Sequence, residues 1–205
     1  ITAADTDGIE LTWGNGEAVL RMIDRIAARE GFGDILAEGA MRAAERIGKG
    51  ASQYAVVVKG LEVPMHDPRA YHGLALSYAT GVRGACHTND LTYSMEQGIL
   101  VWPEIGIQGG YDQKSSVGKA EPVKLSQDLG QVMNAAPICY MLMSVINGQD
   151  LTDLLREASG YDYTLEEIMT CGERIWMLKR GLDNLMGVSA KDDVLPKQLL
   201  TPPPD

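Results

Sequence analysis

The sequence is poor in cysteine, in phenylalanine and in positive charge. Its three cysteines, Cys86, Cys139 and Cys171, form an odd and sparse set, which argues against a disulfide framework and favours a reducing, cytoplasmic setting. Lys and Arg number 18 against 28 Asp and Glu, and the formal net charge is −10. Because nucleic acids and anionic membranes are bound mainly through Lys and Arg, this balance argues against both as partners.

Long hydrophobic runs and the common catalytic motifs are also missing. No apolar run reaches the roughly 18 residues that would indicate a membrane span, and the polar, acidic start is unlike a signal peptide. The chain has no GxGxxG that follows a strand and opens a helix, and no GxxxxGK[ST], HExxH or CxxC. Its first residue is Ile rather than Met, so we expect the chain to be processed or to be a piece of a longer protein.

What the sequence does contain is a series of helical patterns. Apolar residues recur with helical spacing over several segments, and only the β-branched run at 54–58 is typical of a strand. Residues 65–120 are Gly-rich and irregular, with one or two short helices near 70–80 and 94–99. We therefore expect a mainly α, multihelical fold with long ordered loops and little or no β-sheet. The longer predicted helices span 17–30, 35–47, 121–146 with a break at Pro137, 150–159 and 165–185.

The last of these helices has the clearest local signals. Thr164 and Glu167 have the spacing of a capping box, which opens a helix by satisfying its first backbone N–H groups. The helical spacing predicts that one apolar face turns inward. The residues expected on that face are Ile168, Cys171, Ile175, Leu178, Leu182 and Leu185.

All three histidines lie within residues 66–87. Imidazole is the side chain best suited to proton transfer near neutral pH, so this segment is the first place to look for chemistry. Residue types alone allow His87, next to Cys86, to be part of a metal pair, a general acid or base, or a loop histidine that bonds a carbonyl group. His66 and His72 are interpreted as residues that shape the loop.

A second polar cluster surrounds the expected helix break at Pro137. Cys139 follows the break directly, and it is either a ligand presented there or a buried apolar thiol. Asp128 and Asn134 flank the same break, where they are either solvated or available to a heterocycle with many donors and acceptors. Cys171, on the inward face of the last helix, is interpreted as a core residue.

Nine segments, in this order, resemble the C-terminal part of the tungsten-dependent aldehyde ferredoxin oxidoreductase family. They run from about Asp7 to Leu200, and each alone is a weak signal. The matching segments are Trp13–Asn15, Ile26–Asp34, Leu36–Gly39, Lys59–Pro64, Asp67–Arg69, Tyr78–Thr80 with Arg83–His87, Gln127–Leu129, Gly172–Trp176, and Asp192–Asp193 with Leu195–Lys197.

The resemblance implies a tungsten ion held between two pterin dithiolenes, with a [4Fe-4S] cluster close by. It also implies that residues 1–56 form a helical hairpin that ends the family's second domain, and that residues 57–205 form its helical third domain. The parent protein is then expected to oxidise aldehydes to carboxylic acids and to pass electrons through the cluster to ferredoxin or another carrier. Self-association into a homo-oligomer is left open.

The resemblance also assigns roles to individual residues. His87 aligns with the family's catalytic histidine beside the tungsten, and Cys139 aligns with the fourth cysteine ligand of the cluster. Asn134, Ile138 and Cys139 fall in the family's D-x-x-G-L-C motif at the pterin, with Asn134 in place of Asp and Pro137 in place of Gly. Asn89 occupies the position of a lysine that contacts the cofactor.

These differences suggest a subgroup with another substrate. The alternatives are a tungsten-containing reductase of aromatic acyl-CoA thioesters, of the benzoyl-CoA type, and a helical module that is inactive in isolation. The other three cluster cysteines lie upstream in the family, and a [4Fe-4S] cluster needs four ligands. We therefore expect the isolated chain to bind neither cofactor and to require the missing N-terminal part of the same protein.

Overall fold

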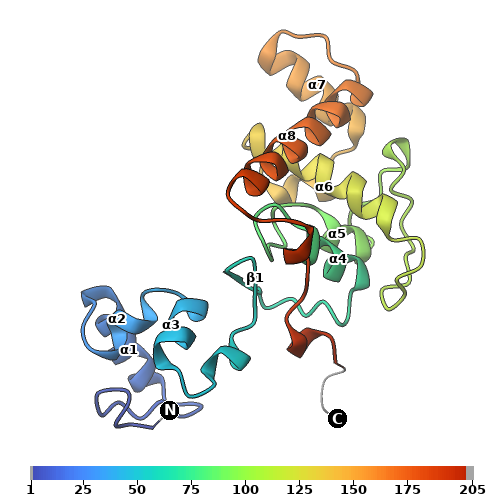
Figure 1. Cartoon of the computed structure of the whole chain (residues 1–205). Coiled ribbons are helices and arrows are strands. Elements are labelled where there is room, and N and C mark those ends of the chain that lie inside the picture. The colour runs from blue at the N-terminus through green and yellow to red at the C-terminus, as the bar shows by residue number, and fades with distance from the viewer. Residues whose placement is uncertain (1, 202–205) are drawn as a thin grey trace. The chain divides into compact units, whose positions relative to one another are not determined.

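Helices form most of the computed structural model, which describes residues 2–201 (Figure 1). Within this range there are eight α-helices and one sheet of two very short strands, so the expected mainly α fold is confirmed. The chain divides into two compact units between Val57 and Val58. No helix in the described range combines the length and apolar character needed to cross a membrane.

The first unit contains α1 (Gly16–Ala28), α2 (Phe32–Leu36), α3 (Ala40–Ile47) and the 3-10 helix η1 (Ala51–Tyr54). The Asn15 side chain caps α1 by accepting a hydrogen bond of 3.1 Å from the backbone N–H of Ala18. The single helix predicted over 35–47 was wrong. Gly39, with φ of +85°, separates α2 from α3, because this left-handed conformation interrupts a right-handed helix.

A small sheet comes next in the chain, where the second unit begins, and in it β1 (Val57–Val58) pairs with β2 (Leu61–Glu62). Short helices and loops follow, and then three longer helices. The remaining elements are α4 (His72–Thr80), α5 (Thr92–Glu96), η2 (Pro103–Ile105), α6 (Ala120–Ala135), η3 (Tyr140–Ser144), α7 (Gly148–Ser159), α8 (Leu165–Leu185), η4 (Ala190–Asp192) and η5 (Lys197–Leu199).

The long segment between α5 and α6 is tied to the core by a buried ion pair. Lys119 forms this pair with Glu96, and both side chains are almost fully buried. The Glu96 carboxylate also accepts a hydrogen bond of 2.8 Å from the backbone N–H of Leu74, near the start of α4. The two ends of the segment are thereby held against α4, as expected for an ordered loop.

The helix α6 lies at the centre of the second unit, beside α8 (Figure 1). Glycine permits close approach on two of its sides: a Cβ atom at Gly130 would lie 2.5 Å from the Cα atom of Asp90, and one at Gly172 in α8 would lie 2.2 Å from the carbonyl oxygen of Asp128. The helix is therefore held between α8 and the loop that carries His87. The predicted break near Pro137 is confirmed, since α6 ends at Ala135.

The capping box of α8 is confirmed, but the predicted inward face of this helix was partly wrong. Ile168 is buried, and Cys171 is partly buried. Leu178, Leu182 and Leu185 are 70%, 59% and 85% exposed. The side of α8 that packs on α6 includes Gly172 instead, because a helix without a side chain at that position can approach its neighbour more closely.

Candidate active site around His87

The loop that carries His87 is anchored on both sides. Before it, Gly84 has φ of +86°, and a Cβ atom there would lie 2.4 Å from the carbonyl oxygen of Val58, so the close approach to β1 requires glycine. After it, the buried Asp90 carboxylate accepts hydrogen bonds of 2.5 Å from the Ser77 hydroxyl and 2.9 Å from the backbone N–H of Thr92. These anchors give His87 a defined position between α4 and α5.

The ring of His87 lies among other aromatic rings. Its centroid is 4.2 Å from that of His66 in an edge-on arrangement, and 6.4 Å from that of Tyr93. Its Nδ1 atom is buried and has no hydrogen-bond partner among the described residues, 2–201. Partial burial, together with the neighbouring His66, lowers the pKa of His87 below its usual value of 6.5. His87 is therefore neutral at neutral pH.

His87 opens onto a cavity of about 410 Å³ in the second unit. Its walls are largely apolar or aromatic, with imidazole and hydroxyl groups at a few positions. The lining residues are His66, His87, Thr88, Tyr93, Ser94, Ile99, Tyr140, Met141, Met143 and Ser144. An apolar cavity with a few convergent polar groups is the usual form of a small-molecule site.

Two hydroxyl groups in this wall are bonded to each other. The Tyr140 hydroxyl and the Ser94 hydroxyl lie 2.5 Å apart. Burial raises the pKa of Tyr140 above its usual value, and burial together with Tyr71 also raises the pKa of Tyr93. Both phenols remain protonated at neutral pH, and the imidazole of His87 stays neutral beside them.

The predicted pterin residues lie on a neighbouring surface. Asn134 and Ile138, with Thr88 and Tyr140, help to line a small cavity of about 20 Å³, and Thr88 and Tyr140 also line the larger one. The Asn134 amide nitrogen donates hydrogen bonds to the carbonyl oxygens of Asn89, at 3.1 Å, and Gly130, at 2.7 Å. The structure thus brings Asn89, Asn134 and Ile138 together beside His87.

Cys139 is exposed and immediately precedes η3, while Cys86 and Cys171 are both partly buried. The thiol of Cys86 lies 3.4 Å from the Thr88 hydroxyl, which fits a packing role. Across residues 2–201, no group of three or more His, Cys, Asp or Glu side chains is arranged as a metal site. The described residues therefore provide one exposed sulfur, that of Cys139, as a ligand for a cluster, but they form no complete metal site.

Other residues singled out from the sequence lie away from this surface. Asp128 is buried and pairs with Lys124 at 2.7 Å, and burial raises its pKa despite that cation. The Nδ1 atom of His72 lies 3.0 Å from the Ser116 hydroxyl. His66, in contrast, contacts His87, although it was expected only to shape the loop. The one sequence signal for this contact was the gathering of all three histidines in one segment.

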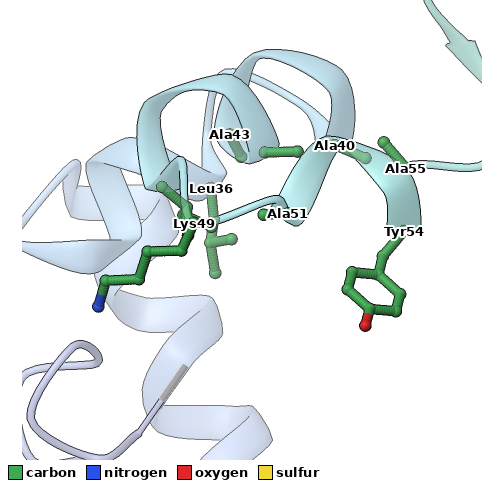
Figure 2. Close-up of a pocket in the computed structure, with 9 residues that line it drawn as sticks. Leu36, Ala40, Ala43, Lys49, Ala51, Tyr54 and Ala55 are labelled. Carbon is green, nitrogen blue, oxygen red and sulfur yellow. The ribbon is translucent and has the colours of Figure 1, made fainter.

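A second cavity, of about 420 Å³, lies in the first unit and is mostly apolar. Figure 2 shows Leu36, Ala40, Ala43 and Ala51 around it, with the Lys49 and Tyr54 side chains pointing in different directions. The Lys49 ammonium group pairs with Asp5 at 2.9 Å. Its one lining cation is paired in this way, and no histidine is among its lining residues, in contrast to the cavity at His87.

Comparison with known proteins shows the family to which the chain belongs. The whole chain, residues 1–205, matches the family model described as aldehyde ferredoxin oxidoreductase, domains 2 and 3. It is 38% identical over 203 residues to the tungsten-containing aldehyde ferredoxin oxidoreductase of Pyrococcus furiosus, a match that covers 96% of this chain and 31% of the relative. It is 40% identical over 202 residues to the enzyme of the same name from Pyrococcus abyssi, covering 93% of this chain and 30% of that relative.

A solved structure shares the fold. It is the active site complex BamBC of benzoyl coenzyme A reductase in complex with 1,5 dienoyl-CoA, with a TM-score of 0.72 at 21% sequence identity. The match covers 97% of this chain and 35% of that chain. The chain thus spans about a third of the length of the relatives it matches. Its match to the family model over the full sequence shows that it belongs to the aldehyde ferredoxin oxidoreductase family.

Proposed function

We propose that this chain forms one wall of a tungsten-pterin active site, in a protein that oxidises aldehydes to carboxylic acids and passes the electrons to ferredoxin or another carrier. The observation that carries the proposal is the cavity of about 410 Å³ in which a neutral imidazole, His87, meets largely apolar walls. Membership of the family supports the reaction class.

Asn89, Asn134, Ile138 and Cys139 would hold the cofactors. The amide nitrogen of Asn134 donates both of its hydrogen bonds to backbone carbonyls, so its side-chain oxygen is available to an N–H donor of a pterin ring. The exposed sulfur of Cys139 would supply one of the four ligands that a [4Fe-4S] cluster needs. When bound, the tungsten centre supplies the two-electron oxidation and the cluster carries the electrons away.

His87 has a separate role in this proposal. Conversion of an aldehyde and water to a carboxylic acid releases two protons together with two electrons. A neutral imidazole at the cavity wall accepts one of these protons as a general base. The apolar side chains of Ile99 and Met143 limit the water around the substrate, which strengthens the interactions that the polar groups make with it.

The test uses the full-length protein with His87→Asn. We expect turnover of aldehydes to fall by about 10²- to 10⁴-fold, the usual contribution of a general base, while the tungsten and iron contents per protein stay unchanged. The matched control is His72→Asn, because His72 bonds Ser116 and does not line this cavity. Normal turnover in His87→Asn would refute the assigned role.

The substrate class is tested on the same preparation. The relatives with 38% and 40% identity are named for aldehyde oxidation, whereas the likeness to benzoyl coenzyme A reductase, at 21% identity, concerns the fold. We expect dye-linked aldehyde oxidation and no dye-dependent reduction of an aromatic acyl-CoA thioester. The reverse result would show that the protein is a thioester reductase. If the full-length protein contained neither tungsten nor iron, this chain would be a helical module without a cofactor.

A further inference from the structure

His66 is the nearest ring to His87 in the wall of the cavity. The two imidazole centroids are 4.2 Å apart with an interplanar angle of 60°. The His66 ring also lies over Tyr93, with centroids 4.3 Å apart and an interplanar angle of 38°. His66 therefore lies against both rings, and all three line the same cavity.

The backbone of His66 is held by the core. Its carbonyl oxygen accepts a hydrogen bond of 3.3 Å from the hydroxyl of Tyr78, which is fully buried in α4. Tyr93 is held in turn by Tyr71, whose ring centroid lies 5.2 Å away in an edge-on arrangement. The position of the His66 ring is thus fixed from two helices, α4 and α5.

We propose, on the basis of the function proposed above, that His66 is a positioning residue for His87, whose ring it holds in place and keeps in the neutral, proton-accepting form. The argument is electrostatic. Burial makes the largest contribution to the lowered pKa of His87, and His66, whose ring centroid is 4.2 Å away, adds to it because like charges at this distance repel each other. Both contributions disfavour a proton on His87.

The groups that face the two histidines do not offset this repulsion. Tyr93 from α5 and Tyr140 from η3 remain neutral phenols, because burial raises the pKa of each. Tyr78 from α4 is neutral for the same reason. The carboxylates closest in the chain are engaged elsewhere: Asp67 pairs with Arg69 at 2.5 Å, and Asp90 is buried with its hydrogen bonds to Ser77 and Thr92.

The test measures both histidines in the full-length holoenzyme. Diethyl pyrocarbonate reacts with neutral imidazole, so the pH dependence of its reaction with the His87 peptide, followed by mass spectrometry, reports the protonation of His87. In His66→Phe, which keeps a flat ring but cannot be protonated, we expect the midpoint for His87 to move up towards 6.5. The acid limb of kcat/KM should move up with it, with tungsten and iron contents unchanged.

Two further variants make the result specific. His66→Gln also removes the imidazole and should shift the midpoint in the same direction, and it replaces the Phe variant if that variant does not fold. Tyr93→Phe keeps the ring and removes only the hydroxyl, so it should leave the midpoint in place. If neither His66 variant moves the midpoint, His66 has a packing role alone and the proposal is overturned. This readout needs no aldehyde turnover, so it stays distinct from a failure of the proposed function.

Discussion

Gly172 of α8 lies against the backbone of Asp128 in α6, so closely that a Cβ atom at Gly172 would stand 2.2 Å from the Asp128 carbonyl oxygen. Real Cβ atoms do not approach a backbone oxygen to this distance, and the neighbour is a helix backbone that cannot rotate away as a flexible side chain would. Any side chain at Gly172 would therefore force α8 away from α6. This close contact explains why Gly172–Trp176, one of the nine segments that resemble the family, begins with glycine.

We predict that Gly172→Ala lowers the free energy of unfolding by about 1–3 kcal/mol or more, the usual cost of overpacking a well-packed interface. The matched control is Gly181→Ala in the same helix, where a Cβ atom would meet open space. That control should raise stability by up to about 1 kcal/mol, because Ala favours a helix over Gly. Equilibrium urea unfolding measures both, and equal effects of the two variants would show that α8 does not pack as described.

The local signals in the sequence predicted the helix ends better than the helix faces. The Thr164–Glu167 box caps its helix as predicted, because a cap depends on residues within one turn. The face of α8 depends on a distant partner. Periodicity shows that an apolar stripe with Leu182 and Leu185 exists, but Gly172, which sets the contact with α6, carries no hydrophobic signal.

For the candidate site too, the sequence predicted some features and missed others. Residue types alone marked His87 and Cys139 as candidates, and the family resemblance assigned their roles. The contact between His66 and His87 depends on how the chain folds back through α4, which lies between them in the sequence. Tyr140, which also lines the cavity, comes from η3, after α6. Such contacts between residues far apart in the sequence follow from the tertiary fold, which neither periodicity nor spacing encodes.

The C-terminal part of the chain is joined to the rest of the second unit through Asp193. Its carboxylate pairs with the buried ammonium group of Lys59 at 2.7 Å and with the guanidinium group of Arg180 at 2.9 and 2.6 Å. Burial alone would raise the pKa of Asp193, but the hydrogen bonds from Arg180 and Lys59 outweigh burial and leave this pKa below its usual value of 3.8. The carboxylate therefore stabilises the fold in its charged form.

We predict that Asp193→Asn lowers the free energy of unfolding at pH 7 by about 3 kcal/mol, because removal of one partner leaves the buried Lys59 cation without its counter-charge. A lowered pKa in the folded state means that this stabilisation is complete above pH 3.8 and is lost as the pH falls through the lower value. The difference between the wild type and the variant should then shrink in acid. The neighbouring exposed residue provides the control: Asp192→Asn removes the carboxylate that caps the backbone N–H of Ser189 and should cost about 1 kcal/mol. A pH-independent difference for Asp193→Asn would contradict the ion-pair account.

The exposure of Cys139 allows its proposed role as a cluster ligand to be tested without measuring activity. In the 205-residue chain, we predict that iodoacetamide modifies Cys139 faster than Cys86 or Cys171, because only Cys139 is exposed. In the full-length holoprotein the same thiolate would be bonded to iron, and its modification should be blocked until a chelator removes the cluster. Cys171→Ser is the matched control and should keep the iron content, whereas Cys139→Ser should lose cluster iron. Peptide mass spectrometry reads the modification at each cysteine. If Cys139 in the iron-loaded protein reacts as fast as in the isolated chain, it is not a ligand, and the cluster must be held by other residues.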